Sequence, residues 1–300
     1  MSRRHLLMLL ALSGLWGASF MFIKIGVREL EPTTLVCARL GIGALTLAPV
    51  AFWRLGARTV VRESRAAWRP LVLIGLVNSA IPIVSISWAE KRIDSGLTAV
   101  IQASAPLFTA VLALRFARHD RVTGSRLVGM LVGFSGVALL VGLQPRGDVV
   151  AALAVTFAAV CYAVAAIYSA RALADVPPLV SALGALTAAS LGLAPFALAQ
   201  LPSHFPSWKV TGAMLALSIG GTGVAYVLYY ALLSGAGASR GILITYLVPA
   251  IALAYGVLLL GEPLTIAAVA GLALVLAGVA LGTGVVKPLR PRVQATEVGS

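Results

Sequence analysis

The sequence predicts an all-α polytopic membrane protein, in which ten transmembrane helices form two inverted repeats of five helices each. The first supporting observation is composition: 60% of the 300 residues are hydrophobic and only 11% are charged, whereas soluble domains carry about 25% charged residues. The second is that apolar segments of membrane-spanning length, about 20 residues, follow one another along nearly the whole chain. The third is that the second half repeats motifs of the first half.

The expected membrane segments fall into two sets, separated by turn-forming residues. The first set covers residues 5–27, 33–53, 70–89, 95–116 and 124–143. The second set covers residues 148–170, 177–200, 209–233, 239–260 and 265–286. Residues 1–143 and 148–286 are therefore the two expected repeats, and residues 287–300 form a short tail. The first segment stays apolar to Val27 without a convincing cleavage site, so we expect a retained helix.

Basic residues gather in alternate loops of this arrangement, most densely at 54–69 and 115–126. Cytoplasmic loops of membrane proteins carry the excess of Lys and Arg. This distribution predicts that both termini, including the tail, are cytoplasmic. The same loops explain the net charge of +13, so the charge does not call for a nucleic-acid partner.

The two halves also share sequence motifs at nearly constant spacing. Asp120-Arg-Val-Thr123 corresponds to Glu262-Pro-Leu-Thr265, and Trp16 corresponds to Tyr162. Because each unit has an odd number of helices, the second unit begins on the opposite side of the membrane. Inverted repeats of this kind are typical of secondary transporters with a central binding site.

Four expected helices contain residues that weaken a helix near its middle. A proline removes the hydrogen bond to the carbonyl four residues earlier, and in hydrocarbon that carbonyl must face protein or a watery cavity. Any one such site is explained by ordinary helix packing, but four in symmetric positions favour a central cavity. The residues expected to kink or gate these helices are Pro82, Pro106, Gly220, Gly221 and Pro249.

Polar and aromatic side chains near these weak points are the candidates for substrate binding. Amides and hydroxyls bind the carboxylate and ammonium of an amino acid, and aromatic faces accept its side chain or a cation. The candidates are Trp16, Asn78, Ser85, Trp88, Gln102, Tyr226, Thr245 and Tyr246. For Trp88, which lies near a helix end, an interfacial anchor is the favoured role and substrate binding the alternative. A further group of tyrosines, with roles open among lipid contact, packing and cavity, comprises Tyr162, Tyr168, Tyr229 and Tyr230.

Two basic residues, Lys24 and Arg39, fall within or beside the first two segments toward their outer ends. The default expectation is that both side chains snorkel to the lipid headgroups. The alternative is that they contact a substrate carboxylate at the outer mouth of the pathway.

Acidic residues and histidines are expected to lie outside the hydrocarbon core. All acids and histidines fall in expected loops, tails or helix ends. A proton-coupled antiporter needs a deep titratable group, so the sequence predicts uncoupled transport. Cys37 and Cys161 lie within apolar segments, and neither a disulfide framework nor a metal site follows. No membrane-embedded catalytic group or phosphate-binding loop is evident, so we expect no enzyme activity and no cofactor.

Small residues repeat at four-residue spacing in the 124–143 and 265–286 segments, as Gly129 with Gly133 and Gly278 with Gly282. This spacing lets helices approach closely. Packing within one chain is the favoured interpretation and predicts a monomer; dimerisation is the alternative.

Several of these motifs resemble the EamA branch of the drug/metabolite transporter superfamily. They are Trp16-Gly17, Gly261-Glu-Pro-Leu-Thr265 and the Gly271…Gly278-Val279 pattern. The likeness extends from about residue 8 to residue 284 and is strongest to the YddG-type amino-acid exporters. It implies a carrier of the bacterial inner membrane. The first half departs from the pattern, with His119-Asp120 where the second half has Gly261-Glu262, so a role of Glu262 at a helix end does not transfer to Asp120.

The resemblance and the neutral deep positions together predict an exporter of aromatic and other neutral amino acids. A phosphorylated cargo would need clustered Lys and Arg deep in the pathway. The expected mechanism is alternating access, by rocking of the two halves about a midplane site. The expected partners are the amino-acid substrate and the lipid bilayer. The alternative function is efflux of apolar drugs or other small metabolites.

Overall fold

The structure is a computed structural model that describes residues 3–116, 125–142, 148–236 and 243–282. These residues form helices joined by turns and loops, with no strand among them, which confirms the all-α prediction. Eight helical stretches are long and apolar enough to cross a membrane, as expected of a polytopic protein. They are Arg3–Gly26, Pro32–Leu55, Trp68–Glu90, Ser95–Ala113, Val149–Ala172, Pro178–Ala199, Trp208–Ser234 and Leu243–Leu260.

Two shorter apolar helices lie where the fifth and tenth spans are expected. These are α8 (Ser125–Gly142) and α15 (Ile266–Gly282), whose apolar parts fall short of a full span. The count of ten transmembrane helices therefore stays a prediction. Asp120 and the 287–300 tail lie outside the described residues. The basic 54–69 loop contains a short helix, α3 (Ala57–Ala66).

Three of the four expected weak points interrupt their helices. Before Pro82 the chain widens into a π-helical segment, η1 (Gly75–Ala80), between α4 (Trp68–Ile74) and α5 (Ile81–Glu90). Before Pro106 a turn separates α6 (Ser95–Gln102) from α7 (Ala105–Phe116). The glycine-rich stretch forms a second π-helical segment, η2 (Ala216–Val224), between α11 (Trp208–Leu215) and α12 (Ala225–Ala236). By contrast, α14 (Leu243–Leu260) continues as one helix through Pro249.

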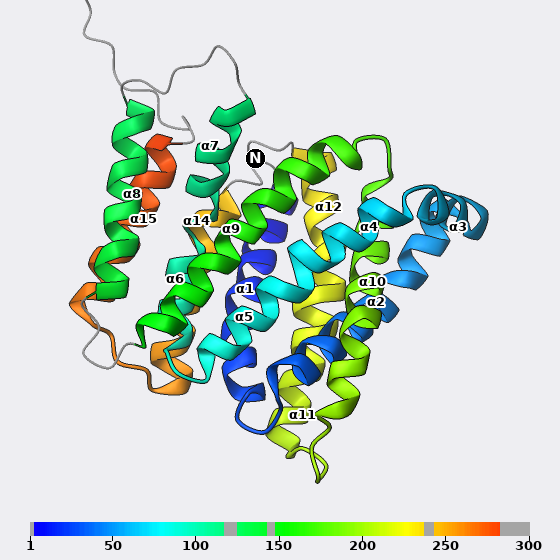
Figure 1. Cartoon of the computed structure of the whole chain (residues 1–300), viewed down its shortest axis with the longest axis horizontal. Coiled ribbons are helices and arrows are strands. Elements are labelled where there is room, and N and C mark those ends of the chain that lie inside the picture. The colour runs from blue at the N-terminus through cyan, green and yellow to red at the C-terminus, as the bar shows by residue number, and fades with distance from the viewer. Residues whose placement is uncertain (1–2, 117–124, 143–147, 237–242, 283–300) are drawn as a thin grey trace, which may run out of the picture.

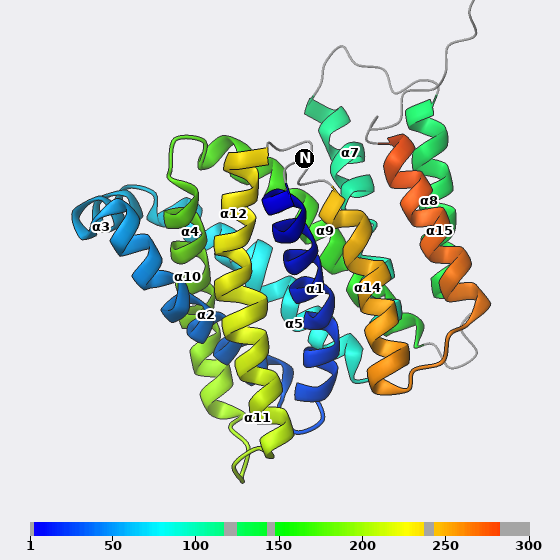
Figure 2. The ribbon, with the colours of Figure 1, turned by 180° about the vertical axis from the view of Figure 1, so that it is seen from behind.

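Helices of the first half pack mainly against helices of the second half. The most extensive pairs are α8 with α15, α2 (Pro32–Leu55) with α10 (Pro178–Ala199), α1 (Arg3–Gly26) with α14, and α5 with α9 (Val149–Ala172). Figures 1 and 2 show the α8–α15 pair at one edge, with α2, α3 and α10 toward the other edge and α1 between them. The halves are therefore interleaved and do not form two separate bundles.

The helix bundle has two faces, which the direction of α1 distinguishes (Figure 2). We call the side on which α1 begins the amino-terminal face; α7 and α12 also end there. The opposite side, called the far face, holds the end of α1, the end of α14 and the start of α11 (Figure 1).

The small-residue motifs of α8 and α15 pack against each other within the chain. A Cβ atom at Gly278 would overlap the Cα and backbone N of Gly133, and would lie 2.7 Å from the carbonyl O of Gly129. The close approach of these two helices therefore depends on the absence of side chains, in agreement with the packing interpretation of the motifs.

The substitution Gly278→Ala should separate α8 from α15, because backbone atoms cannot move aside as a flexible side chain can. We expect a loss of about 1–3 kcal/mol, typical of overpacking, seen as a lower melting temperature in detergent. Gly212→Ala in α11 is the matched control, since nothing lies within 4 Å of the added Cβ. Equal melting temperatures for the two variants would contradict the packing described here.

A carboxylate outside the membrane segments joins two loops on the far face. Glu29, between α1 and α2, accepts hydrogen bonds from the backbone N of Ser207 at 2.7 Å and from its Oγ at 2.6 Å. Ser207 in turn caps α11 through a bond from Val210 N. The Ser207 hydroxyl and amide lower the pKa of Glu29 from its usual value.

This contact predicts a pH-dependent contribution of Glu29 to stability. Since its pKa is lowered on folding, the contribution should be present above the unfolded pKa, about 4.3, and should fade as the pH falls through the folded pKa. The variant Glu29→Gln should therefore melt below the wild type at pH 7, and the two should converge in acid. A difference in melting temperature that is constant between pH 7 and pH 3 would be inconsistent with this assignment.

Candidate functional site

Two adjoining cavities lie between the halves, at the level of the helix interruptions. The first has a volume of about 400 Å³ and the second about 670 Å³. Both are lined by side chains from α1, α6, α9, α12 and α14, and these shared residues are Trp16, Phe20, Gln102, Tyr162, Tyr229 and Val248. We call the first the central cavity and the second the vestibule.

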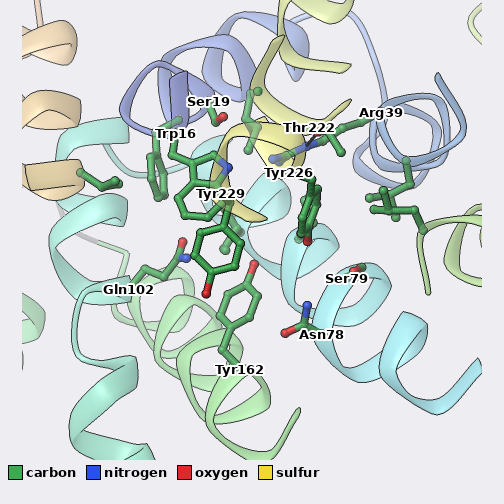
Figure 3. Close-up of a pocket in the computed structure, with 18 of the residues that line it drawn as sticks. Trp16, Ser19, Arg39, Asn78, Ser79, Gln102, Tyr162, Thr222, Tyr226 and Tyr229 are labelled. Carbon is green, nitrogen blue, oxygen red and sulfur yellow. Dashed lines mark hydrogen bonds between the residues drawn. The ribbon is translucent and has the colours of Figure 1, made fainter. Parts of the chain in front are cut away.

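Aromatic side chains make up one wall of the central cavity. The ring centroids of Trp16 and Tyr229 lie 5.3 Å apart, and those of Tyr229 and Tyr230 lie 5.4 Å apart. Tyr226 stacks on Tyr230, with 6.1 Å between the ring centroids. The aromatic wall is thus a continuous group built from α1 and successive turns of α12. Figure 3 shows Tyr162, from α9, extending toward the same space.

Polar groups on the central cavity come from the interrupted helices and from α2. Asn78 and Ser79 belong to η1, and Gln102 ends α6. Arg39 of α2 donates from Nε to Thr222 Oγ1 at 3.1 Å, and Thr222 Oγ1 bonds back to the carbonyl of Leu217 at 3.1 Å within η2. None of the described residues accepts a hydrogen bond from the two Nη atoms of Arg39. The guanidinium therefore lines the cavity with its terminal donors still available (Figure 3).

The vestibule leads from the central cavity toward the amino-terminal face. Its wall follows α6 and α7 from Ala99 to Ala113 and includes Thr245 and Pro249 of α14. Along α6, α7 and the turn between them, five of the eight lining residues are alanine, which leaves the space wide and apolar. The two helix-interior prolines, Pro106 of α7 and Pro249 of α14, therefore both line the vestibule.

The far face is closed beneath the central cavity. Three buried isoleucines form the cavity floor: Ile23, Ile83 and Ile86. Below them, Lys24 Nζ donates to the carbonyl oxygens of Glu90 at 2.7 Å and Ile93 at 2.8 Å. This contact ties the end of α1 to the α5–α6 turn.

A second connection across the far face comes from Glu262, which precedes α15. Its Oε1 accepts from Ser95 N at 2.8 Å, and its Oε2 accepts from Ser95 Oγ at 3.0 Å and Gly96 N at 3.1 Å. The carboxylate thereby satisfies backbone donors at the start of α6 and interacts favourably with that helix terminus. Outside this layer, Lys91 pairs with Glu31 at 2.8 Å and Arg92 with Asp148 at 3.1 Å.

The structure brings several predicted site residues together and leaves others apart. Those that line one or both cavities are Trp16, Arg39, Asn78, Gln102, Pro106, Gly221, Tyr226, Thr245 and Pro249. Those outside the lining are Lys24, Pro82, Ser85, Trp88, Gly220 and Tyr246. The Ser85 hydroxyl donates to the carbonyl O of its own helix at Ile81, and the buried Tyr246 hydroxyl has no hydrogen-bond partner within the described part of the chain. Trp88 stacks under Arg92, whose Cζ lies 3.9 Å from the ring centroid.

One expectation about charged residues is wrong, and one acid at a helix end has a buried side chain. The default expectation that Lys24 and Arg39 snorkel to the headgroups is wrong, because Lys24 binds backbone carbonyls and Arg39 binds Thr222 in the cavity wall. Glu90 ends α5, as its position suggested, but its side chain is fully buried.

Several residues that line the central cavity were not predicted from the sequence, or had more than one expected role. Ser19, Ser79 and Thr222 were not singled out, and Tyr162, Tyr229 and Tyr230 were not distinguished from lipid-facing or packing tyrosines. One signal could have identified Tyr162: it occupies the repeat position of Trp16, a predicted cavity residue. The serines and threonine carry no such signal, since hydroxyls commonly bond back to their own helix.

Comparison with known proteins places this chain among transporters. The model of the EamA-like transporter family matches residues 3–142 and 149–283. An uncharacterised transporter of Archaeoglobus fulgidus is 28% identical, over 88% of this chain and 93% of that protein. The uncharacterised inner membrane transporter YedA of Escherichia coli K12 is 27% identical, over 86% of this chain and 83% of that protein.

Two further matches concern substrate and fold. A probable terminal-alkyne amino-acid exporter of Streptantibioticus cattleyicolor is 30% identical, over 42% of this chain and 40% of that protein. A protein crystal structure with 22% sequence identity matches 95% of this chain and 98% of the other with a TM-score of 0.66, which supports the fold alone. Since the family model covers almost the whole chain, the protein belongs to the EamA-like transporter family.

Proposed function

We propose that this transporter exports aromatic and other neutral amino acids across the inner membrane by alternating access, without coupling to an ion. The observation that carries the proposal is the central cavity, in which one guanidinium with free terminal donors faces an aromatic wall. Its volume of about 400 Å³ lies within the range of about 300–1,000 Å³ usual for small-molecule sites.

Each part of an amino acid has a chemical counterpart in this cavity. The planar guanidinium of Arg39 suits a carboxylate, which accepts paired hydrogen bonds from it. The amide oxygens of Asn78 and Gln102 can accept from the ammonium group, and aromatic faces attract a cation or an apolar side chain. Arg39 thus serves as a carboxylate contact, located in the central cavity and not at the outer mouth.

Alternating access is supported by the closed far face, the open vestibule and the interleaved helices. In the expected repeats, α1 corresponds to α9 and α6/α7 corresponds to α14. The packing of α1 against α14 is therefore matched by the packing of α9 against α6/α7, and the packing of α2 against η2 is matched in the same way by that of α10 against η1. This reciprocal pattern favours inverted repeats. With the basic loops in the cytoplasm, the vestibule opens inward. Inner-membrane placement is supported by the relative named YedA, and the amino-acid class by the Streptantibioticus relative.

Uncoupled transport is supported by the chemistry of the cavity walls. Among the described residues that line the two cavities there is no acid and no histidine. A solute would then move down its own gradient, and net export would follow from a high internal concentration.

A second candidate function, efflux of apolar drugs or other small metabolites, is favoured by the vestibule alone. Its alanine-rich wall and volume of about 670 Å³ would accept a larger apolar solute. The two functions differ in whether the Arg39 guanidinium is needed.

Uptake into proteoliposomes across a panel of labelled amino acids tests the proposal directly. We expect saturable uptake of aromatic amino acids and acceleration by unlabelled substrate on the opposite side, since a carrier but not an open pore shows counterflow. Transport of a cationic dye together with no uptake of any amino acid would favour the second function instead.

The substitution Arg39→Gln should weaken binding of amino acids by about 10- to 100-fold, because a hydrogen bond to a charged group contributes about 1.5–3 kcal/mol. Arg39→Lys should restore part of the loss. The readouts are the dissociation constants for phenylalanine and for phenethylamine, which lacks the carboxylate. The Arg39→Gln variant should lose affinity for phenylalanine and keep its affinity for phenethylamine.

Arg28→Gln, an exposed residue between α1 and α2, is the matched control and should bind both compounds as the wild type does. Equal loss of affinity for both compounds in Arg39→Gln would show that Arg39 acts through the shape of the cavity and not through the carboxylate.

A further inference from the structure

A fully buried acid lies behind the isoleucine floor of the central cavity. Glu90 is one helical turn beyond Ile86 and is completely shielded from solvent. Neither of its carboxylate oxygens has a hydrogen-bond partner among the described residues. Glu90 also lines neither cavity, so the transport route proposed above makes no use of it.

The charged groups that face Glu90 come from three neighbouring elements: Lys24 on α1, Arg39 on α2 and Glu262 before α15. The ammonium of Lys24 bonds the backbone carbonyls of Glu90 and Ile93 and forms no ion pair with the Glu90 carboxylate. Glu262 is held by Ser95 and Gly96. Three further segments pack against α5: η1, α6 and α9. Neither η1 nor α6 contains a charged residue, and the titratable residues of α9 are Cys161, Tyr162, Tyr168 and, in its last turn, Arg171.

This environment suits a neutral carboxylic acid. An ionised carboxylate that is buried without a hydrogen-bond donor is strongly disfavoured, and such a group takes up a proton instead. If the far face opened, water would reach the carboxyl group and Lys24 would be released from the two carbonyls. Both changes favour the ionised form. Closed and open far faces therefore call for different protonation states of one side chain.

We propose that Glu90 is a proton-binding site that controls closure of the far face. As that face closes, the carboxylate takes up one proton from the adjacent water, and as it opens the carboxylic acid returns that proton to the same water. No proton crosses the membrane, so the carrier remains uncoupled. This inference rests on the proposed alternating access, and it makes acidity on the far face a signal that favours the state open to the amino-terminal face.

Exposure of the α5–α6 turn, measured without any substrate, tests this proposal. Ile93 is only 4% exposed, so Ile93→Cys should react with a hydrophilic thiol reagent only when the far face opens. The variant is made with both native cysteines, Cys37 and Cys161, replaced by alanine, and is studied in lipid nanodiscs at uniform pH. Its labelling rate is divided by that of Arg28→Cys, at an exposed position between α1 and α2 on the same face, which removes the effect of pH on thiol reactivity.

The normalised rate should fall as the pH is lowered, by at most about tenfold per pH unit, the limit for one proton. With Glu90→Gln, which stays neutral, the rate should be low and independent of pH. Glu31→Gln, at an exposed acid on the same face, is the matched control and should keep the pH dependence of the wild-type background.

Two outcomes would overturn the proposal: a normalised rate that does not vary with pH in the wild-type background, or the same pH dependence in Glu90→Gln. The first comparison needs no Glu90 variant, so the test holds even if Glu90→Gln does not fold. In liposomes, accumulation of substrate driven by a pH gradient and lost in Glu90→Gln would overturn same-side proton exchange. Because labelling needs no substrate, failure of amino-acid uptake would refute the proposed amino-acid substrates and leave this inference, which needs only alternating access, standing.

Discussion

The structure depends on one constraint: a backbone polar group within the hydrocarbon must find a partner in the protein or face a watery space. The interruptions at η1, η2 and the α6–α7 turn all break the regular helical bonding. Each of them also supplies side chains to the central cavity, Asn78, Thr222 and Gln102 respectively. The cavity lies where the helices are incomplete, and the residues that prevent regular helix also make its wall polar.

Close packing of small residues makes this arrangement sterically feasible. A Cβ at Gly43 would crowd Thr222 and one at Gly223 would crowd Thr46, so α2 and η2 approach closely. That approach brings Arg39 of α2 within hydrogen-bonding distance of Thr222. A guanidinium so deep in a membrane protein needs both a polar partner and a cavity. By allowing α2 and η2 to approach closely, Gly43 and Gly223 bring the polar partner, Thr222, within reach of Arg39.

Much of the fold and part of the site follow from local sequence chemistry. Membrane segments depend on composition, and the weakening effect of Pro82, Pro106 and the 218–223 glycines acts on their own helices, so these features are visible in the sequence. The direction in which Tyr229 faces depends on how α12 packs against α1, and the burial of Glu90 depends on the elements packed against α5, of which α9 makes the most extensive contact. Such tertiary relations leave no periodic signal, which is why Arg39 was expected to snorkel and why the burial of the Glu90 side chain was not predicted.

On the proposed function, the charge of Arg39 also affects how the carrier changes state. A closed cavity removes water from the guanidinium, and an unpaired charge in a low-dielectric site is costly. A bound carboxylate compensates that charge when the cavity closes, so the loaded carrier should cross the occluded state more easily than the empty one. A carrier with this property exchanges substrate faster than it returns empty. The arginine that recognises the substrate would then also ensure that closure follows binding.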